Sequence, residues 1–136
     1  MIDEQETKNM ESFMRELSGC ESLIMKTVWD VKEDIAVQDL IRELAVRYNK
    51  NYARTTVVTF LHKMAEKGYV STYRKGKASF VHAEKSEEEY TADLLRKQTD
   101  FWFSGKPSKL VASLCETQEL SLEEISKIKE LIENVE

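Results

Sequence analysis

The chain has 136 residues and a formal net charge of −5 at pH 7, with 41% hydrophobic and 33% charged residues, which is ordinary for a soluble protein of one domain or two small ones. No apolar run approaches the roughly 18 residues that span a bilayer, and the first residues are acidic where a signal peptide would be basic. We therefore expect a cytoplasmic protein that does not enter a membrane.

A polar N-terminal extension, residues 1–17, precedes the first predicted helix. Ser18 and Glu21 form the Ser-x-x-Glu pattern of a capping box, in which each side chain satisfies a free amide at a helix start. This helix should end near Asp30. Residues 35–37 are too few for more than a very short strand, and apolar residues at helical spacing predict a second helix over 40–48.

A third helix is predicted from about Tyr52 to Lys67, and a hairpin follows it. Gly68 suits the left-handed conformation that often ends a helix. Residues 69–74 and 78–83 are rich in β-branched and aromatic residues and flank Lys75-Gly76-Lys77, which predicts two strands joined at a glycine turn. The order of these elements predicts a winged helix-turn-helix domain over residues 18–84, in a mainly α fold with a small β-hairpin wing.

Positive charge gathers between Lys50 and Lys77. This stretch has seven basic residues against one acid, a net +6, which leaves −11 for the remainder of the chain. A cationic face on an acidic body attracts a polyanion to one defined surface. The alternative is a lysine-rich face that is merely solvated.

The third predicted helix has two chemically different sides. Val57, Leu61 and Met64 fall on one side with Phe60, and hydroxyls and cations fall on the other. Threonine offers base edges both a hydroxyl and a methyl group, whereas side chains at a helix start and at the hairpin tip are placed to hold phosphates. Threonines that only face solvent are the alternative, and His62 either contacts DNA or is simply exposed. The residues predicted to bind double-stranded DNA are Lys50, Asn51, Tyr52, Arg54, Thr55, Thr56, Thr59, His62, Lys63, Arg74, Lys75 and Lys77.

Residues 85–136 predict a second, helical region. Gly105-Lys106-Pro107 interrupts its first helix, and a second capping box at Ser121 and Glu124 begins its last. Its apolar residues exceed what so small a domain can cover, which predicts a homodimer; a small intramolecular helical layer is the alternative. The predicted dimerisation residues are Leu94, Phe101, Phe103, Leu110, Val111, Leu114, Leu122, Ile125, Ile128, Leu131 and Ile132.

Sequence motifs for catalysis and metal binding do not occur in the chain. It has no Gly-rich phosphate loop, no Gly-x-Ser-x-Gly and no cluster with metal-ligand spacing, so we predict no enzyme, metal site or cofactor. Cys20 and Cys115 lie far apart in the sequence, and neither has metal-type spacing with His62 or His82. We expect both to be buried, reduced thiols.

Several short motifs, in their order and spacing, resemble the penicillinase-repressor family of bacterial winged-helix regulators. The resemblance extends from about Ser18 to the C-terminus and implies an N-terminal winged helix, a C-terminal helical dimerisation region, and repression by binding palindromic operator DNA. The motifs are Glu21, Ile24-Met25, Val28-Trp29, Thr56-Val57-Val58-Thr59, residues 61–64, Lys67-Gly68-Tyr69-Val70, Phe103-Ser104-Gly105, Leu120-Ser121 and Glu123-Glu124-Ile125.

The resemblance also implies roles for single residues. The family's groove contacts fall on Thr56 and Thr59, with Lys63 where arginine is usual, and lysine cannot form arginine's bidentate fork. In the wing, Lys77 stands where arginine is usual and His82 where tyrosine is usual.

Two kinds of inducing signal are implied by the resemblance, and the sequence matches neither. Antibiotic-responsive members are cut at an Asn-Phe bond, and the matching place here reads Lys97-Gln98, so a sensor protease remains an untested partner. Copper-responsive members end in paired Cys-x-Cys clusters, which this sequence lacks. The sequence therefore predicts a dimeric transcriptional repressor with an unidentified inducing signal. A winged helix that binds other proteins instead of DNA is the alternative function.

Overall fold

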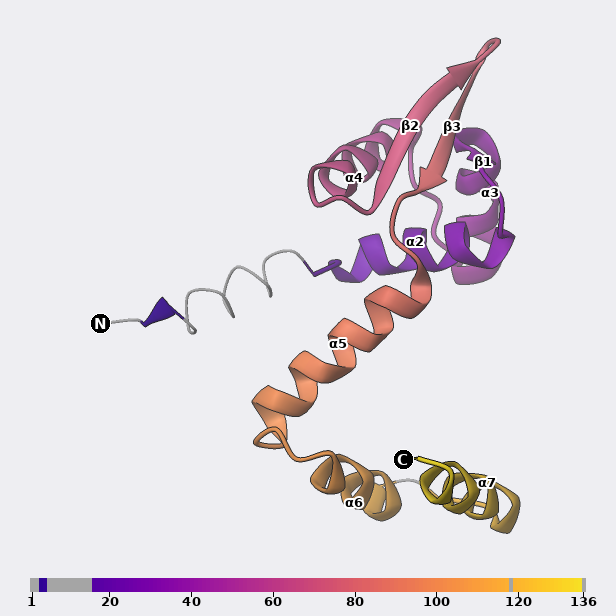
Figure 1. Cartoon of the computed structure of the whole chain (residues 1–136). Coiled ribbons are helices and arrows are strands. Elements are labelled where there is room, and N and C mark those ends of the chain that lie inside the picture. The colour runs from indigo at the N-terminus through magenta and orange to yellow at the C-terminus, as the bar shows by residue number, and fades with distance from the viewer. Residues whose placement is uncertain (1–2, 5–15, 118, 136) are drawn as a thin grey trace. The chain divides into compact units, whose positions relative to one another are not determined.

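The computed structural model describes residues 3–4, 16–117 and 119–135, so most of the predicted N-terminal extension lies outside the described residues. The chain divides into two compact units, residues 1–92 and 93–136, with the boundary inside one helix. The predicted boundary after residue 84 falls in the short link that precedes this helix. In chain order the elements are α2 (Gly19–Val31), β1 (Ile35–Ala36), α3 (Val37–Tyr48), α4 (Arg54–Glu66), β2 (Val70–Lys75), β3 (Ala78–Ala83), α5 (Glu87–Trp102), α6 (Pro107–Thr117) and α7 (Leu122–Glu133) (Figure 1).

The first unit is a winged helix, as the sequence predicted. Its helices α2, α3 and α4 pack on a three-stranded antiparallel sheet of order β1-β3-β2, and Figure 1 shows α4 beside the β2–β3 hairpin. The buried side chains come from all of these elements, because each helix presents one apolar stripe to the same core. The core residues are Ile24, Met25, Val28, Ile35, Val37, Leu40, Leu44, Val57, Leu61, Met64, Tyr69, Val70 and Val81.

The ends of the helices follow local chemistry that is visible in the sequence. The Ser18 hydroxyl accepts the Glu21 amide at 3.2 Å, and the Ser18 amide donates to the Glu21 carboxylate at 2.8 Å, which confirms the first capping box. Gly68, with φ 87°, follows the end of α4. Its amide and that of Tyr69 donate to the carbonyls of Ala65 and Met64, which satisfies the last turn of the helix.

The third helix and the hairpin differ slightly from their predicted bounds. Helix α4 begins at Arg54, so Tyr52 belongs to the loop before it. In the hairpin, Lys75 pairs with Ala78 as the last residue of β2, and only Gly76 and Lys77 form the turn. The predicted three-residue turn was therefore wrong by one residue: Gly76, with φ 66°, makes a two-residue turn whose twist matches the strands.

Aromatic side chains attach the first turns of α5 to the winged helix. The Tyr90 ring lies 5.7 Å from the Trp29 ring and 5.5 Å from the Tyr69 ring, measured between centroids. The Trp29 indole N–H donates to the carbonyl of Lys85 at 2.8 Å. These contacts fix the link between β3 and α5, because aromatic pairs prefer such tilted geometries and the indole donor is satisfied.

The second unit buries almost nothing within a single chain. Among its described residues, 93–117 and 119–135, only Thr99 is buried, and its hydroxyl donates to the Leu95 carbonyl at 2.7 Å. The Ser121 hydroxyl accepts the Glu124 amide at 3.1 Å, as predicted for the start of α7. Cys115 is exposed and Cys20 is half-buried, both as free thiols, so the expectation that they are buried was wrong.

Candidate nucleic-acid interface

Helix α4 separates an apolar side from a polar one, as its periodicity predicted. Val57, Leu61 and Met64 are at most 1% exposed and join the core, while Phe60 is half-buried beside it. Thr56 is also half-buried, at the edge of the polar side. The reading face, as we name the exposed side of α4, consists of Thr55, Thr59, His62 and Lys63.

The Thr59 hydroxyl is oriented by its own helix. It donates to the backbone carbonyl of Thr55 at 2.8 Å. Its hydrogen is therefore used within the helix, and the oxygen remains free only to accept. Such a threonine presents an acceptor and a methyl group, which suits the amino group of adenine or cytosine or the methyl group of thymine.

The loop before α4 is held from below by Cys20. The Tyr52 hydroxyl donates to the Cys20 thiol at 3.2 Å, which raises the pKa of Tyr52, and the Tyr52 ring meets Phe60 edge-on at 6.0 Å. Lys50 and Asn51 are exposed in the same loop. The hydroxyl of Tyr52 is thus directed into the protein, while Lys50 and Asn51 face solvent.

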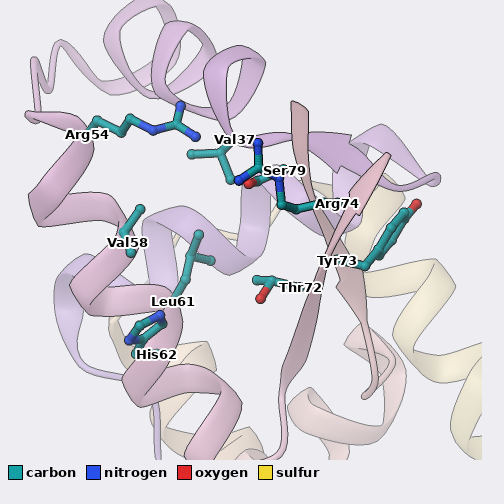
Figure 2. Close-up of a pocket in the computed structure, with 9 residues that line it drawn as sticks. All are labelled: Val37, Arg54, Val58, Leu61, His62, Thr72, Tyr73, Arg74 and Ser79. Carbon is teal, nitrogen blue, oxygen red and sulfur yellow. The ribbon is translucent and has the colours of Figure 1, made fainter. Parts of the chain in front are cut away.

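A hollow of about 200 Å³ separates α4 from the wing, the β2–β3 hairpin (Figure 2). Val37, Val58 and Leu61 line it from the core side. Arg54 reaches over it from the first turn of α4 and Arg74 from β2, and Figure 2 shows both guanidinium groups directed toward the space above Val37. His62, Thr72, Tyr73 and Ser79 complete its lining.

A second hollow, of about 290 Å³, adjoins the first. Arg54 and Ser79 line both hollows, and Lys75, Lys77 and Gln38 line only the second. Ala36 and Ala78 complete its lining. In the part of the chain that the structure describes, no acidic side chain lines either hollow.

Six cations remain unpaired around the reading face and the hollows. Each is exposed and, within the described part of the chain, has neither a carboxylate partner nor another side-chain hydrogen bond. The seventh basic residue counted from the sequence, Lys67, is different: it donates to the Glu21 carboxylate at 2.6 Å and to the Glu16 carbonyl at 3.0 Å. Counting Lys67 with the cationic face was therefore wrong. The six are Lys50, Arg54, Lys63, Arg74, Lys75 and Lys77.

The wing is attached to the loop before β1 by Asp34. The Asp34 carboxylate accepts the Tyr73 hydroxyl at 2.5 Å and lies 2.7 Å from His82 Nδ1. The two bonds lower the pKa of Asp34, that from Tyr73 more strongly, and the bond with Asp34 raises the pKa of both Tyr73 and His82. The Tyr73 ring also stacks on Phe80 with centroids 5.6 Å apart. Asp34 thus holds both strands of the wing at one point.

Four polar residues that line the hollows were not predicted from the sequence: Gln38, Thr72, Tyr73 and Ser79. Ser79 pairs with Arg74 across the hairpin. The three-residue turn that was predicted would instead pair Arg74 with Ala78, so the correct turn length would have placed Ser79 beside Arg74. Gln38 has no comparable local signal, because its position depends on how α3 packs against the wing.

The predicted dimerisation residues lie on α5, the α5–α6 link, α6 and α7, and the single chain buries none of them fully. Leu122, Leu131 and Ile132 are 86%, 68% and 60% exposed. Phe101, Val111 and Leu114 are exposed as well, whereas the others are half-buried: Leu94, Phe103, Leu110, Ile125 and Ile128. The place that matches the family's cleavage bond, Lys97-Gln98, lies within α5 and is half-buried.

Comparison with known proteins gives a match over nearly the whole chain. The sequence profile described as "Penicillinase repressor" matches residues 17–134. The chain belongs to the penicillinase repressor family. A curated penicillinase repressor from Bacillus licheniformis is 22% identical over 118 residues, which cover 87% of this chain and 90% of that protein.

Membership in the penicillinase repressor family makes this a winged-helix, DNA-binding regulator of transcription of the repressor type. The exposed hydroxyls and unpaired cations of α4 and the wing lie on the elements that such folds use for DNA. Among the described residues, no helix is both long and apolar enough to cross a membrane.

Proposed function

We propose that the chain acts as a homodimer that represses transcription by binding palindromic operator DNA through α4 and the wing. The observation that carries the proposal is the set of six unpaired cations around the hydroxyl-bearing reading face, on a chain whose net charge is −5. Cations with no partner in the protein are free to replace the counterions of a DNA backbone. Threonine is a mediocre helix former, so several threonines on the exposed side of α4 weaken the helix. A lysine-rich face that is merely solvated gives no reason for them to be there.

The homodimer is supported by the apolar surface of residues 93–136. Nine of the eleven large hydrophobic side chains that are exposed among the described residues lie in this stretch. Exposed apolar surface gathered in one region marks an interaction site. A two-fold dimer places two copies of α4 in successive major grooves, about 34–36 Å apart, on an inverted repeat. Release follows a signal other than cleavage of an Asn-Phe bond, because the matching place in α5 is Lys97-Gln98.

The test of DNA recognition is selection of duplexes from a random pool, followed by gel shifts of the selected and scrambled sequences at several salt concentrations. We expect an inverted repeat and affinity at least about 10³-fold above that for scrambled DNA. If binding never rises above the non-specific level even at low salt, the winged helix serves instead to bind proteins.

The test of the dimer is sedimentation of the Leu131→Asp/Ile132→Asp variant, with Ser126→Asp on the same helix as control. Ser126 is exposed and polar, so its substitution should leave the dimer intact. The double variant should sediment as a monomer and lose operator affinity while it keeps non-specific binding. A wild-type protein that is already monomeric would contradict the proposed dimer.

A further inference from the structure

We propose that one strand of the DNA backbone lies in the trough formed by the two hollows, with neighbouring phosphates bound on either side of Arg54. The inference rests on the proposed DNA binding and adds a path for the strand and two positioning residues, Gln38 and Ser79. The trough runs between the first turns of α3 and α4 on one side and the wing on the other.

The trough gathers like charges that the protein leaves unneutralised. Arg54 and Arg74 converge over the first hollow (Figure 2). Arg54 also lines the second hollow together with Lys75 and Lys77. No acidic side chain of the described residues lines either hollow, so a bound anion would relieve the mutual repulsion of the cations. Arginine adds geometric selection, because its planar fork matches two oxygens of one phosphate.

The N-termini of α3 and α4 add to the positive potential of the trough. Val37, the first residue of α3, lines the first hollow, and Arg54, the first residue of α4, lines both. The caps of these helices are Ala36 and Ala53, neither of which offers a side-chain acceptor to the free amides. Free amides at a helix start favour an anion. Asp39 in the first turn of α3 is paired with Arg42 and lines neither hollow.

Gln38 and Ser79 supply neutral hydrogen-bond donors at the points where the trough needs them. Ser79 lines both hollows and stands opposite Arg74 in the hairpin, and Gln38 lies across the second hollow from the wing. Neutral donors fix the position of a phosphate without adding further repulsion. Because the helix side and the wing side contact the same two phosphates, the bound strand couples α4 to the wing.

The experiment uses the full chain and the selected operator, in which each backbone phosphate is replaced in turn by an uncharged methylphosphonate. We expect two neighbouring positions in each half-site at which wild-type affinity falls roughly tenfold, the effect of removing a charge-assisted contact. In Arg54→Gln, both positions should lose most of their sensitivity. Ser79→Ala should weaken sensitivity at both and Gln38→Ala at one, with the base preference unchanged.

The matched control is Lys50→Gln, which removes an exposed cation that lines neither hollow. It should weaken binding and leave the sensitivity at the two neighbouring positions at the wild-type level. A salt slope lowered by about 1 for Arg74→Gln would agree with the loss of one phosphate contact. If wild type binds its operator but Arg54→Gln shows the same profile as wild type, the strand path is wrong and the proposed function stands. If wild type shows no specific DNA binding, both fail.

Discussion

Replacement of Lys67 by methionine tests the buried ion pair that ties the end of α4 to the start of α2. The Glu21 side chain is 2% exposed and the Lys67 side chain 23%. One Glu21 oxygen, Oε2, is buried and has no hydrogen-bond partner among the described residues. Among the described residues, Lys67→Met would leave a buried carboxylate that is held by Ser18 alone, mainly through the capping-box amide. Removing one partner of a buried pair costs about 3–5 kcal/mol, and the partial exposure of Lys67 places the expected loss near the lower value, about 3 kcal/mol.

Urea unfolding at pH 7 measures this loss as a change in the free energy of unfolding. A Trp102→Phe background leaves Trp29, in the first unit, as the single fluorescent tryptophan. The Glu21→Gln/Lys67→Met double variant should be more stable than Lys67→Met, because a neutral amide is easier to bury than an unpaired carboxylate. Arg42→Gln, which breaks an exposed pair with Asp39, should cost under about 1 kcal/mol.

The pH dependence of the same variant has a defined sign. Burial by itself raises the pKa of Glu21, but the hydrogen bonds from Lys67 and Ser18 and the charge of Lys67 outweigh it, and the pKa is lowered from 4.5. The pair therefore stabilises the fold above the unfolded pKa and loses this effect as the pH falls through the folded pKa. The stability gap between wild type and Lys67→Met should narrow in that acidic range. A gap below about 1 kcal/mol at pH 7 would refute the reasoning.

Two further predictions concern the reading face and the wing. Thr59→Ala should reduce discrimination between operator and random DNA by the equivalent of about 1–3 kcal/mol. Lys75→Ala should weaken binding to operator and to random DNA alike and lower the salt slope by about 1. Parent-like gel shifts for both variants would show that the reading face is misassigned. Asp34 raises the pKa of His82 above its ordinary value of 6.5. The contact therefore stabilises the wing fully at pH values below 6.5, and this stabilisation is lost as the pH rises through the folded pKa of His82. In a His62→Gln background, proton NMR should show the remaining histidine titrating lower in Asp34→Asn, and an unchanged titration would contradict the contact.

Periodicity predicted those features of the interface that depend on one helix alone. The spacing of Val57, Leu61 and Met64 sufficed to place Thr59 and Lys63 on the exposed side, because a helix fixes which residues share a face. Charge counting over the same stretch failed for Lys67. Its partner, Glu21, lies 46 positions away, so no local pattern indicates that this cation is neutralised inside the fold.

The geometry of the trough could not be predicted from the sequence, because it also depends on residues that lie far apart along the chain. The residues of the two hollows come from α3, α4 and both strands of the wing, and a shift of one residue in the turn changes which side chain faces Arg74. All four cations of the trough were predicted from the sequence, whereas Gln38 and Ser79 were not. A cation can be assigned to a DNA-binding surface from its charge alone. A neutral hydrogen-bond donor can be assigned to that surface only once its distance to the cations is known.

Residues 93–136 show what an apolar pattern can and cannot predict. The stripe through Leu122, Leu131 and Ile132 indicated a surface that requires cover, and the single chain leaves these three side chains 60–86% exposed. Exposure on this scale is unfavourable in water, at about 25 cal/mol for each Å² of apolar area. The centre of the same stripe, Ile125 and Ile128, is half-buried within the single chain, whereas Leu122 and Leu131, nine positions apart, lie about half a turn from each other at its two edges. The proposed homodimer would cover these edges, because a second copy of the chain offers an identical stripe.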